Sequence, residues 1–223
     1  MTTNPAIKRT YRIIFVLLTW FALAGHFSQI VLQRAEDTNI LRALVNYFSY
    51  FTIQSNWLVA LWWSTAIVTR DQSDATAILK PKVKGAFTVY ISVTMIAYAV
   101  LLANSWTPGG LDLILSTITH YITPLAFILD WVFFERMHTY QWRFALDWLI
   151  YPLLYFVYAM AYGAITGKSL YPFFNVSSLG AGGVAIQTAL LLALFLVLAS
   201  LYITVNKFWP EKYVTEGDNH AHD

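Results

Sequence analysis

The stretch that decides the fold is residues 182–205, which read GGVAIQTALLLALFLVLASLYITV and carry no charged side chain. A helix needs about 20 mostly apolar residues to cross the hydrocarbon core of a bilayer, because each residue adds only about 1.5 Å. A transmembrane β-strand needs about half that number. The length of this stretch therefore predicts a membrane-spanning helix.

The rest of the 223-residue chain has the same character. It is 58% hydrophobic and only 12% charged, with a mean hydropathy of +0.54, and its charges gather between long apolar runs. Such a pattern is typical of an integral membrane protein. Five more windows are long enough to span a bilayer: 13–32, 46–68, 85–103, 113–134 and 145–165. Because the connections are short, we expect an all-α fold with one domain, residues 1–223, in which six transmembrane helices form a bundle.

Positive charges predict the orientation of this bundle. Lys and Arg are enriched in cytoplasmic connections of membrane proteins. Eleven would lie on one side: Lys8, Arg9, Arg12, Arg70, Lys80, Lys82, Lys84, Arg136, Arg143, Lys207 and Lys212. Only Arg34, Arg42 and Lys168 would lie on the other. Both termini are therefore expected in the cytoplasm, and we expect a multi-pass protein of a bacterial inner membrane.

The composition also excludes several classes of function. The chain has no cysteine, so it has no disulfide, no thiolate nucleophile and no thiolate metal site. The net charge of +2 is explained by loops that lie near anionic lipid head groups, so no nucleic-acid partner is expected. The bilayer itself is the expected partner, and the oligomeric state stays open.

Two of the apolar windows contain polar side chains where lipid should be. One holds Thr52, Gln54, Ser55 and Asn56, and the other holds His120. Polar groups are costly to bury in hydrocarbon and are often functional there. We therefore take these two places as the candidate site.

A depth argument places three of the polar residues at one level. Thr52 lies roughly 15 Å along the chain from Arg42, and His120 lies roughly 12 Å past Asp112, at about 1.5 Å per residue. His26 lies roughly 12 Å before Arg34 by the same rise. Thr52, His120 and His26 are thus expected within about one helical turn of one another in depth.

This set suggests nucleophilic catalysis. A threonine hydroxyl becomes a nucleophile when a base removes its proton, and a neutral imidazole suits that task near pH 7. Thr52 and His120 supply the pair. Asn56 could support an oxyanion or orient the imidazole, and Ser55 shares its helical face. Gln54, His26 and Thr123 are further candidates for the polar wall of the pocket.

Structural roles compete with this interpretation. A threonine in a membrane helix usually bonds the carbonyl four residues earlier, and clusters of Gln, Ser and Asn usually hold helices together. Asp130 is too deep to orient His120. Asp130 and Asp147 fall near the cytoplasmic face within reach of Arg136 or Arg143, so an ion pair is favoured over a proton relay.

Two other classes of function stay open. His26 and His120, at matched depth on different helices, could ligate a b-type haem. A transporter or a non-enzymatic scaffold is the third possibility. The sequence has no inverted repeat and no pair of broken helices, which weakens a transporter.

Three segments carry a resemblance to a known family. They are Tyr50-Phe51-Thr52-Ile53-Gln54-Ser55-Asn56, then His120-Tyr121-Ile122-Thr123-Pro124-Leu125-Ala126-Phe127-Ile128-Leu129-Asp130-Trp131, and Tyr171-Pro172-Phe173-Phe174. Their order and placement resemble the androgen-induced and androgen-dependent TFPI-regulating protein family, especially its bacterial six-helix relatives. The resemblance extends over nearly the whole chain.

The resemblance implies an activity. Eukaryotic members of that family are multi-pass hydrolases that cleave fatty-acid esters of hydroxy fatty acids with an intramembrane threonine and a histidine. These two residues would correspond to Thr52 and His120. The implied function is that of a membrane lipid hydrolase without cofactor or metal, whose substrate is a long-chain ester. Its acyl groove would be lined or capped by Tyr171, Pro172, Phe173 and Phe174.

Overall fold

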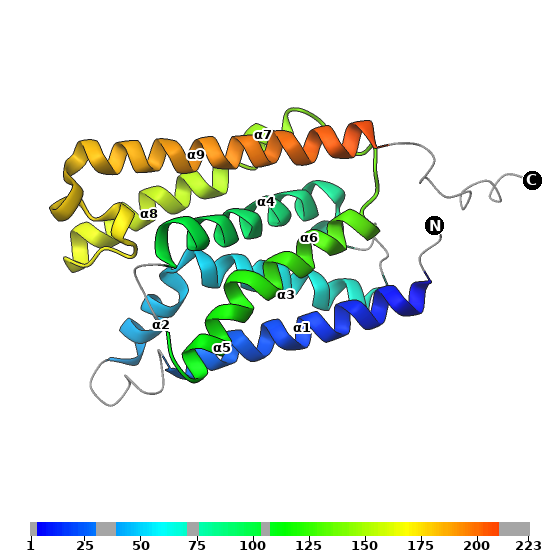
Figure 1. Ribbon diagram of the computed structural model, residues 1–223, viewed down its shortest axis with the longest axis horizontal. Coiled ribbons are helices and arrows are strands. Elements are labelled where there is room, and N and C mark those ends of the chain that lie inside the picture. Colours follow the sequence, from blue (N-terminus) through cyan, green and yellow to red (C-terminus); the bar gives the residue numbers. More distant parts are fainter. Residues whose placement is uncertain (1–3, 30–38, 71–75, 104–107, 210–223) are drawn as a thin grey trace, which may run out of the picture.

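The computed structural model describes residues 4–29, 39–70, 76–103 and 108–209 (Figure 1). Every regular element in these ranges is helical, which confirms the all-α prediction. The α-helices are α1 (Pro5–Phe27), α2 (Ile40–Ser49), α3 (Phe51–Val68), α4 (Pro81–Ala97), α5 (Leu111–Thr117), α6 (Thr123–Phe134), α7 (Phe144–Asp147), α8 (Ile150–Thr166) and α9 (Val176–Phe208). Short 3-10 turns are η2 (Ala77–Leu79) and η5 (Pro172–Phe174), and π-helical turns are η3 (Tyr98–Leu102) and η4 (Ile118–Ile122).

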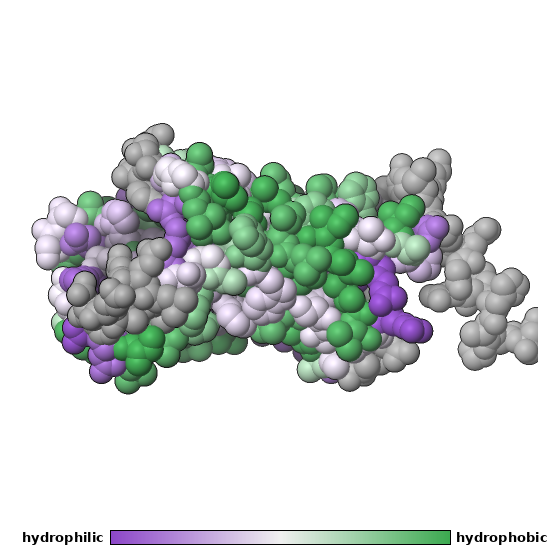
Figure 2. Space-filling model, turned by 90° about the horizontal axis from the view of Figure 1, so that it is seen from below, coloured by the Kyte–Doolittle hydropathy of each residue, from purple (hydrophilic) through white to green (hydrophobic). Residues whose placement is uncertain are grey.

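Five helical runs within these ranges are long and apolar enough to cross a membrane. They are Pro5–Phe27, Pro81–Leu102, Leu111–Phe134, Phe144–Thr166 and Val176–Phe208. Large apolar side chains stand exposed along them, for example Leu17, Leu154 and Val197, each more than 60% exposed. Figure 2 shows this apolar surface along the middle of the molecule, with hydrophilic residues towards both ends. A lipid bilayer is the solvent that such a surface needs, so the chain is a multi-pass membrane protein.

The expected single helix over 46–68 is broken, which corrects the sequence prediction. Tyr50 has an extended backbone (φ −81°, ψ 128°) and separates α2 from α3. A break inside a membrane protein persists when other groups satisfy the freed backbone. The Tyr155 hydroxyl donates to the Ser49 carbonyl and accepts from the Phe51 N–H, and the Gln54 amide donates to the Phe48 carbonyl. Helix α3 carries Thr52, Gln54, Ser55 and Asn56 in its first two turns, and it is not among the five apolar runs.

Other helix ends also differ from the predicted windows. The first helix begins at Pro5, where proline suits the first turn and the Asn4 side chain accepts from the Ala6 N–H. The expected end of that window, residues 30–32, lies outside the described residues. The last helix starts at Val176, after its N-cap Asn175, rather than at residue 182, and it bends at Gly180, whose φ of +66° favours glycine.

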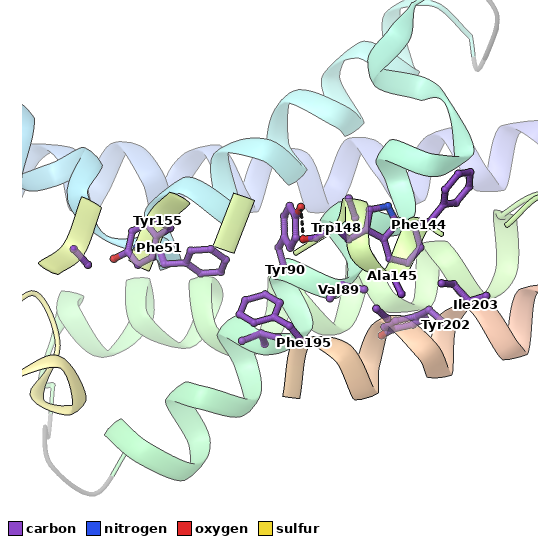
Figure 3. Close-up of a cluster of buried hydrophobic side chains, with 14 of the residues drawn as sticks. Phe51, Val89, Tyr90, Phe144, Ala145, Trp148, Tyr155, Phe195, Tyr202 and Ile203 are labelled. Carbon is purple, nitrogen blue, oxygen red and sulfur yellow. Dashed lines mark hydrogen bonds between the residues drawn. The ribbon is translucent and has the colours of Figure 1, made fainter. Parts of the chain in front are cut away.

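The helices pack around α3 and α4. Helix α3 lies between α1 and α4, and α4 in turn contacts α6 and α9 (Figure 1). A ladder of aromatic rings fills the space between α3, α4, α8 and α9, and Figure 3 shows it running from Phe51 and Tyr155 to Tyr202. Phe51 precedes Thr52 directly, so this core fixes the start of α3 and with it the position of Thr52.

Candidate active site

A narrow apolar cleft lies beside the start of α3. About 620 Å³ of empty space separates its walls, its open mouth included. Thr52 lines it from α3 and Tyr98 from η3, while α8, η5 and α9 supply mostly apolar and aromatic side chains. A few polar groups in an otherwise apolar cleft are typical of a site for an apolar ligand.

Thr52 is held by a tyrosine from the connection between α8 and α9. Its backbone N–H donates to the Tyr171 hydroxyl over 3.4 Å. Burial raises the pKa of Tyr171, so the ring stays a neutral phenol. Tyr171 can therefore accept from the backbone N–H of Thr52 and still donate a hydrogen bond.

His120 lies in the π-helical turn η4 and is almost fully buried. Its Nδ1 is 2.9 Å from the Ser116 carbonyl oxygen. A carbonyl only accepts, so Nδ1 carries the proton and Nε2 carries the lone pair. No hydrogen bond to Nε2 is present among the described residues. In this tautomer, Nε2 is available as a base.

An aromatic ring fixes the plane of this imidazole. Tyr98 stacks on His120 with 3.8 Å between ring centroids and 21° between planes. The Ser116 hydroxyl lies 3.1 Å from the His120 Nδ1 and donates to the Tyr98 hydroxyl over 3.2 Å. Tyr98 is the first residue of the π-helical turn η3, and His120 is the middle residue of the π-helical turn η4. Such turns are frequent at functional sites.

Asn56 connects the helix of Thr52 with the helix of His120. Its side-chain amide donates to the Thr52 carbonyl over 2.8 Å and to the Thr119 carbonyl over 3.1 Å. Its Oδ1 is buried without a hydrogen-bond partner. His26 reaches the same place, since its Nε2 is 3.5 Å from the Thr119 hydroxyl. The structure thus brings Thr52, Asn56, Thr119, His120 and His26 into one polar layer.

Thr52 and His120 themselves make no direct hydrogen bond in the described part of the chain. Thr52 lines the cleft, whereas His120 lies behind Tyr98, which lines it. Hydrogen bonds of a catalytic pair are often long in a ligand-free site and tighten when substrate binds. The pair is therefore close in depth and on adjacent helices, but it is not pre-assembled.

The other sequence candidates divide into two groups. Ser55 bonds the Thr94 hydroxyl, and Thr94 lines the cleft, so Ser55 supports its wall. Gln54 turns away: its carbonyl oxygen accepts from Tyr151 and its amide caps the end of α2. Thr123 pairs with the Thr19 hydroxyl at 2.9 Å and does not line the cleft. Gln54 and Thr123 thus do not line the cleft, and each hydrogen-bonds a side chain of another helix.

The aromatic connection folds onto the bundle. Tyr171, Phe173 and Phe174 line the cleft, while Pro172 does not. The rings of Tyr171 and Phe173 stack at 4.9 Å with only 8° between their planes. This segment forms one wall of the cleft.

A second polar cluster lies deeper in the bundle and is made of charged residues. The Asp130 carboxylate, fully buried, accepts from Arg12 at 2.7 Å, Lys84 at 2.7 Å and the Trp63 indole at 3.1 Å. Lys84 also lies 3.5 Å from Glu135, whose pKa is raised by burial.

The predicted ion pairs exist, but with other partners. Asp130 pairs with Arg12 and Lys84, and Asp147 pairs with Lys82 at 2.6 Å. The prediction of Arg136 or Arg143 as partners is wrong. Helix packing places cations from other helices against the carboxylates, instead of the cations that are close in sequence.

The haem alternative fails a test of fit. The Thr119 hydroxyl is 3.5 Å from the His26 Nε2 and 3.4 Å from the His120 Nδ1, so it stands between the two rings. The His120 nitrogen on this side is Nδ1, which carries a proton for the Ser116 carbonyl and so has no lone pair for iron. Within the described ranges, no three His, Asp or Glu side chains gather in a way that could hold a metal ion.

Sequence reasoning misses the residues that position the pair. Tyr98, Ser116, Thr119 and Tyr155 are not among the candidates named from the sequence. Ser116 and Thr119 lie four and one residues before His120, so helical spacing could have found them. Tyr98 and Tyr155 come from distant helices, and no local pattern signals them.

Comparison with known proteins gives no relative. No family model matches the chain, and neither the curated proteins nor the solved structures include a match. The site itself is therefore the basis for a functional proposal.

Proposed function

We propose that this protein is an integral membrane lipid hydrolase that cleaves long-chain fatty-acid esters, with Thr52 as nucleophile and His120 as base. The observation that carries this proposal is the polar layer beside an apolar cleft. Asn56 joins the backbones next to Thr52 and His120, and the free Nε2 of His120 is the basic nitrogen. Esters of hydroxy fatty acids are the substrates that the family resemblance suggests.

In the proposed reaction, the Thr52 hydroxyl oxygen attacks the ester carbonyl carbon. His120 Nε2 takes the hydroxyl proton and returns it to the leaving alkoxide, so an alcohol departs and an acyl-threonine forms. Water then attacks this acyl group with His120 again as base. The products are a fatty acid and free Thr52.

The start of α3 supports the charge that develops in this reaction. Thr52 is the second residue of α3, and the N-terminus of a helix carries partial positive charge. Phe51 and Thr52 both line the cleft, so the positive end of the α3 dipole would face the carbonyl of a bound ester. The break at Tyr50 is what places a helix start there.

The membrane arrangement belongs to the same proposal. Helices α2 and α3 together make one passage, which with the five apolar runs gives six. In Figure 1, α1 begins and α9 ends at the same end of the bundle, as an even number of passages requires. From the excess of Lys and Arg we propose that this end is cytoplasmic, and we propose a bacterial inner membrane as the location. The cleft then receives its substrate laterally from the bilayer.

Covalent labelling tests the chemistry most directly. Purified protein is treated with a fluorophosphonate probe for serine and threonine hydrolases, and the modified residue is mapped by mass spectrometry. We expect modification of Thr52, which a long-chain ester should suppress by competition. Modification of a different residue would relocate the active site, and no labelling of active protein would refute the covalent route.

A further inference from the structure

A second and larger cavity lies at the end of the bundle that we assign to the outer side. About 1790 Å³ of empty space lies between its walls, its open mouth included. The region of α2 forms one wall, and the last turns of α8 with the segment after it form the other. Its polar lining residues are Asn39, Arg42, Asn46, Tyr50, Tyr162, Thr166, Lys168 and Ser169.

The charges of this cavity have one sign. Arg42 and Lys168 line it, and among the residues that the structure describes no carboxylate does. Neither cation takes part in an ion pair among the described residues. Only three Lys or Arg residues are assigned to the outer side of the whole chain, and two of them meet here. Two cations that have no carboxylate partner in the described ranges, with hydroxyl and amide groups around them, favour an anion.

This cavity adjoins the cleft of Thr52 along two segments. Tyr50 lines the outer cavity, and the next two residues, Phe51 and Thr52, line the cleft. Leu170 lines the cavity, and Tyr171 lines the cleft. The rings of Tyr50 and Tyr171 meet edge to face at 5.9 Å. The contact between Tyr50 and Tyr171 therefore links the linings of the two spaces.

We propose that the outer cavity binds the phosphate head group of the lipid ester whose carbonyl reaches Thr52. The inference deepens the proposed function and rests on it. Arg42 lies on α2 and Thr52 at the start of α3, the next helix along the chain, so the cavity and the reacting hydroxyl are on consecutive elements. A phosphate has more acceptor oxygens than a carboxylate, which suits two cations surrounded by neutral donors. The substrate class is then a glycerophospholipid, and the product a lysophospholipid.

Binding of a lipid that cannot be hydrolysed tests this inference separately from catalysis. The probe is a diether phosphatidylglycerol in neutral detergent micelles, measured by equilibrium dialysis against purified protein. Replacing both cations, Arg42→Gln with Lys168→Gln, should weaken binding about 30-fold, because each surface cation contributes on the order of 1 kcal/mol towards an anionic lipid. The matched control, Arg70→Gln with Lys80→Gln at the opposite end, should bind as the wild type does. Thr52→Ala should also keep wild-type binding.

Three results would overturn the inference. The first is equal binding of the diether lipid by the wild type and by the Arg42→Gln, Lys168→Gln variant. The second is equal binding of a diether glycerol that lacks phosphate. The third is full competition by inorganic phosphate at the concentration of the lipid, which would indicate a site for the free anion.

Hydrolysis separates this inference from the proposed function. If the wild type hydrolyses fatty-acid esters with and without a phosphate head group at equal rates, and the double variant changes neither rate, the head-group site is refuted and the hydrolase is retained. Charge-dependent lipid binding without any ester hydrolysis supports the head-group site and refutes the hydrolase.

Discussion

The imidazole of His120 lies flat against the ring of Tyr98, with 3.8 Å between centroids and 21° between planes. Each residue belongs to a π-helical turn, one in the run that starts with α4 and the other between α5 and α6. Pro124 lacks an N–H and cannot bond the carbonyl of His120, four residues earlier, which helps the backbone leave the regular α-helical pattern there. The stacked pair therefore results from two local departures from the α-helix, and it decides where His120 Nε2 points.

Substitution of Tyr98 tests this positioning. Tyr98→Phe keeps the stacked ring and loses only the contact with the Ser116 hydroxyl, so most activity should remain. Tyr98→Leu removes the ring, and kcat should fall about tenfold to a hundredfold because a displacement of the base by about 1 Å has effects of that size. The pH profile of kcat/KM should also move, since His120 would gain a different environment. A folded Tyr98→Leu variant with wild-type kcat and pH profile would show that the stacking does not position the base.

The two carboxylates at the deeper end should differ strongly in their effect on stability. Asp130→Asn leaves Arg12 and Lys84 short of one buried negative charge, and breaking such a buried network costs about 3 to 5 kcal/mol. Asp147→Asn breaks a pair whose side chains are 37% or more exposed, so it should cost about 0 to 1 kcal/mol. Thermal unfolding in detergent measures both. Turnover per folded molecule should stay within a few-fold in each variant, and its selective loss in folded Asp130→Asn would assign the cluster a catalytic role.

The absence of cysteine in the chain makes its topology directly measurable. Single cysteines introduced as Gly109→Cys and Lys168→Cys should react with a membrane-impermeant maleimide in intact cells. Single cysteines introduced as Lys80→Cys and Gln141→Cys should react only after the membrane is permeabilised. The reverse pattern would invert the bundle and move the cavity of Arg42 to the cytoplasmic side.

The sequence predicts the all-α class and the insertion into a membrane, because both follow from the composition of the chain and the length of its apolar stretches. It also predicts Thr52 and His120 at similar depth from helical rise, although the break at Tyr50 means that Arg42 and Thr52 do not lie on one continuous helix. The break at Tyr50 could not be predicted, because the groups that permit it, above all Tyr155, come from a distant helix. The same holds for Asp130: distance in the sequence suggested Arg136, whereas helix packing supplied Arg12 and Lys84. A local sequence pattern does not predict contacts between helices that are far apart in the chain.

Loss of the nucleophile and loss of the base should have different consequences. Thr52→Ala should abolish both ester hydrolysis and probe labelling, because no acyl-enzyme can form. His120→Ala should lower the rate about 10² to 10⁴-fold, the usual contribution of a general base. Thr65→Ala is the matched control: Thr65 is on the same helix, and its hydroxyl bonds the carbonyl four residues earlier, Leu61. It should hydrolyse esters at the wild-type rate.

Thr52→Ser gives the sharpest test of the nucleophile, because it keeps the hydroxyl and removes only a methyl group. Partial activity and probe labelling of the introduced serine are expected, with the serine still held by the Tyr171 hydroxyl through its backbone N–H. His26→Ala should reduce the rate less than His120→Ala does, since the described member of the polar layer that His26 reaches is the Thr119 hydroxyl, at 3.5 Å. Equal losses in the two histidine variants would make His26 a third member of the catalytic set. A folded Thr52→Ala variant that hydrolyses long-chain esters at the wild-type rate would disprove the mechanism.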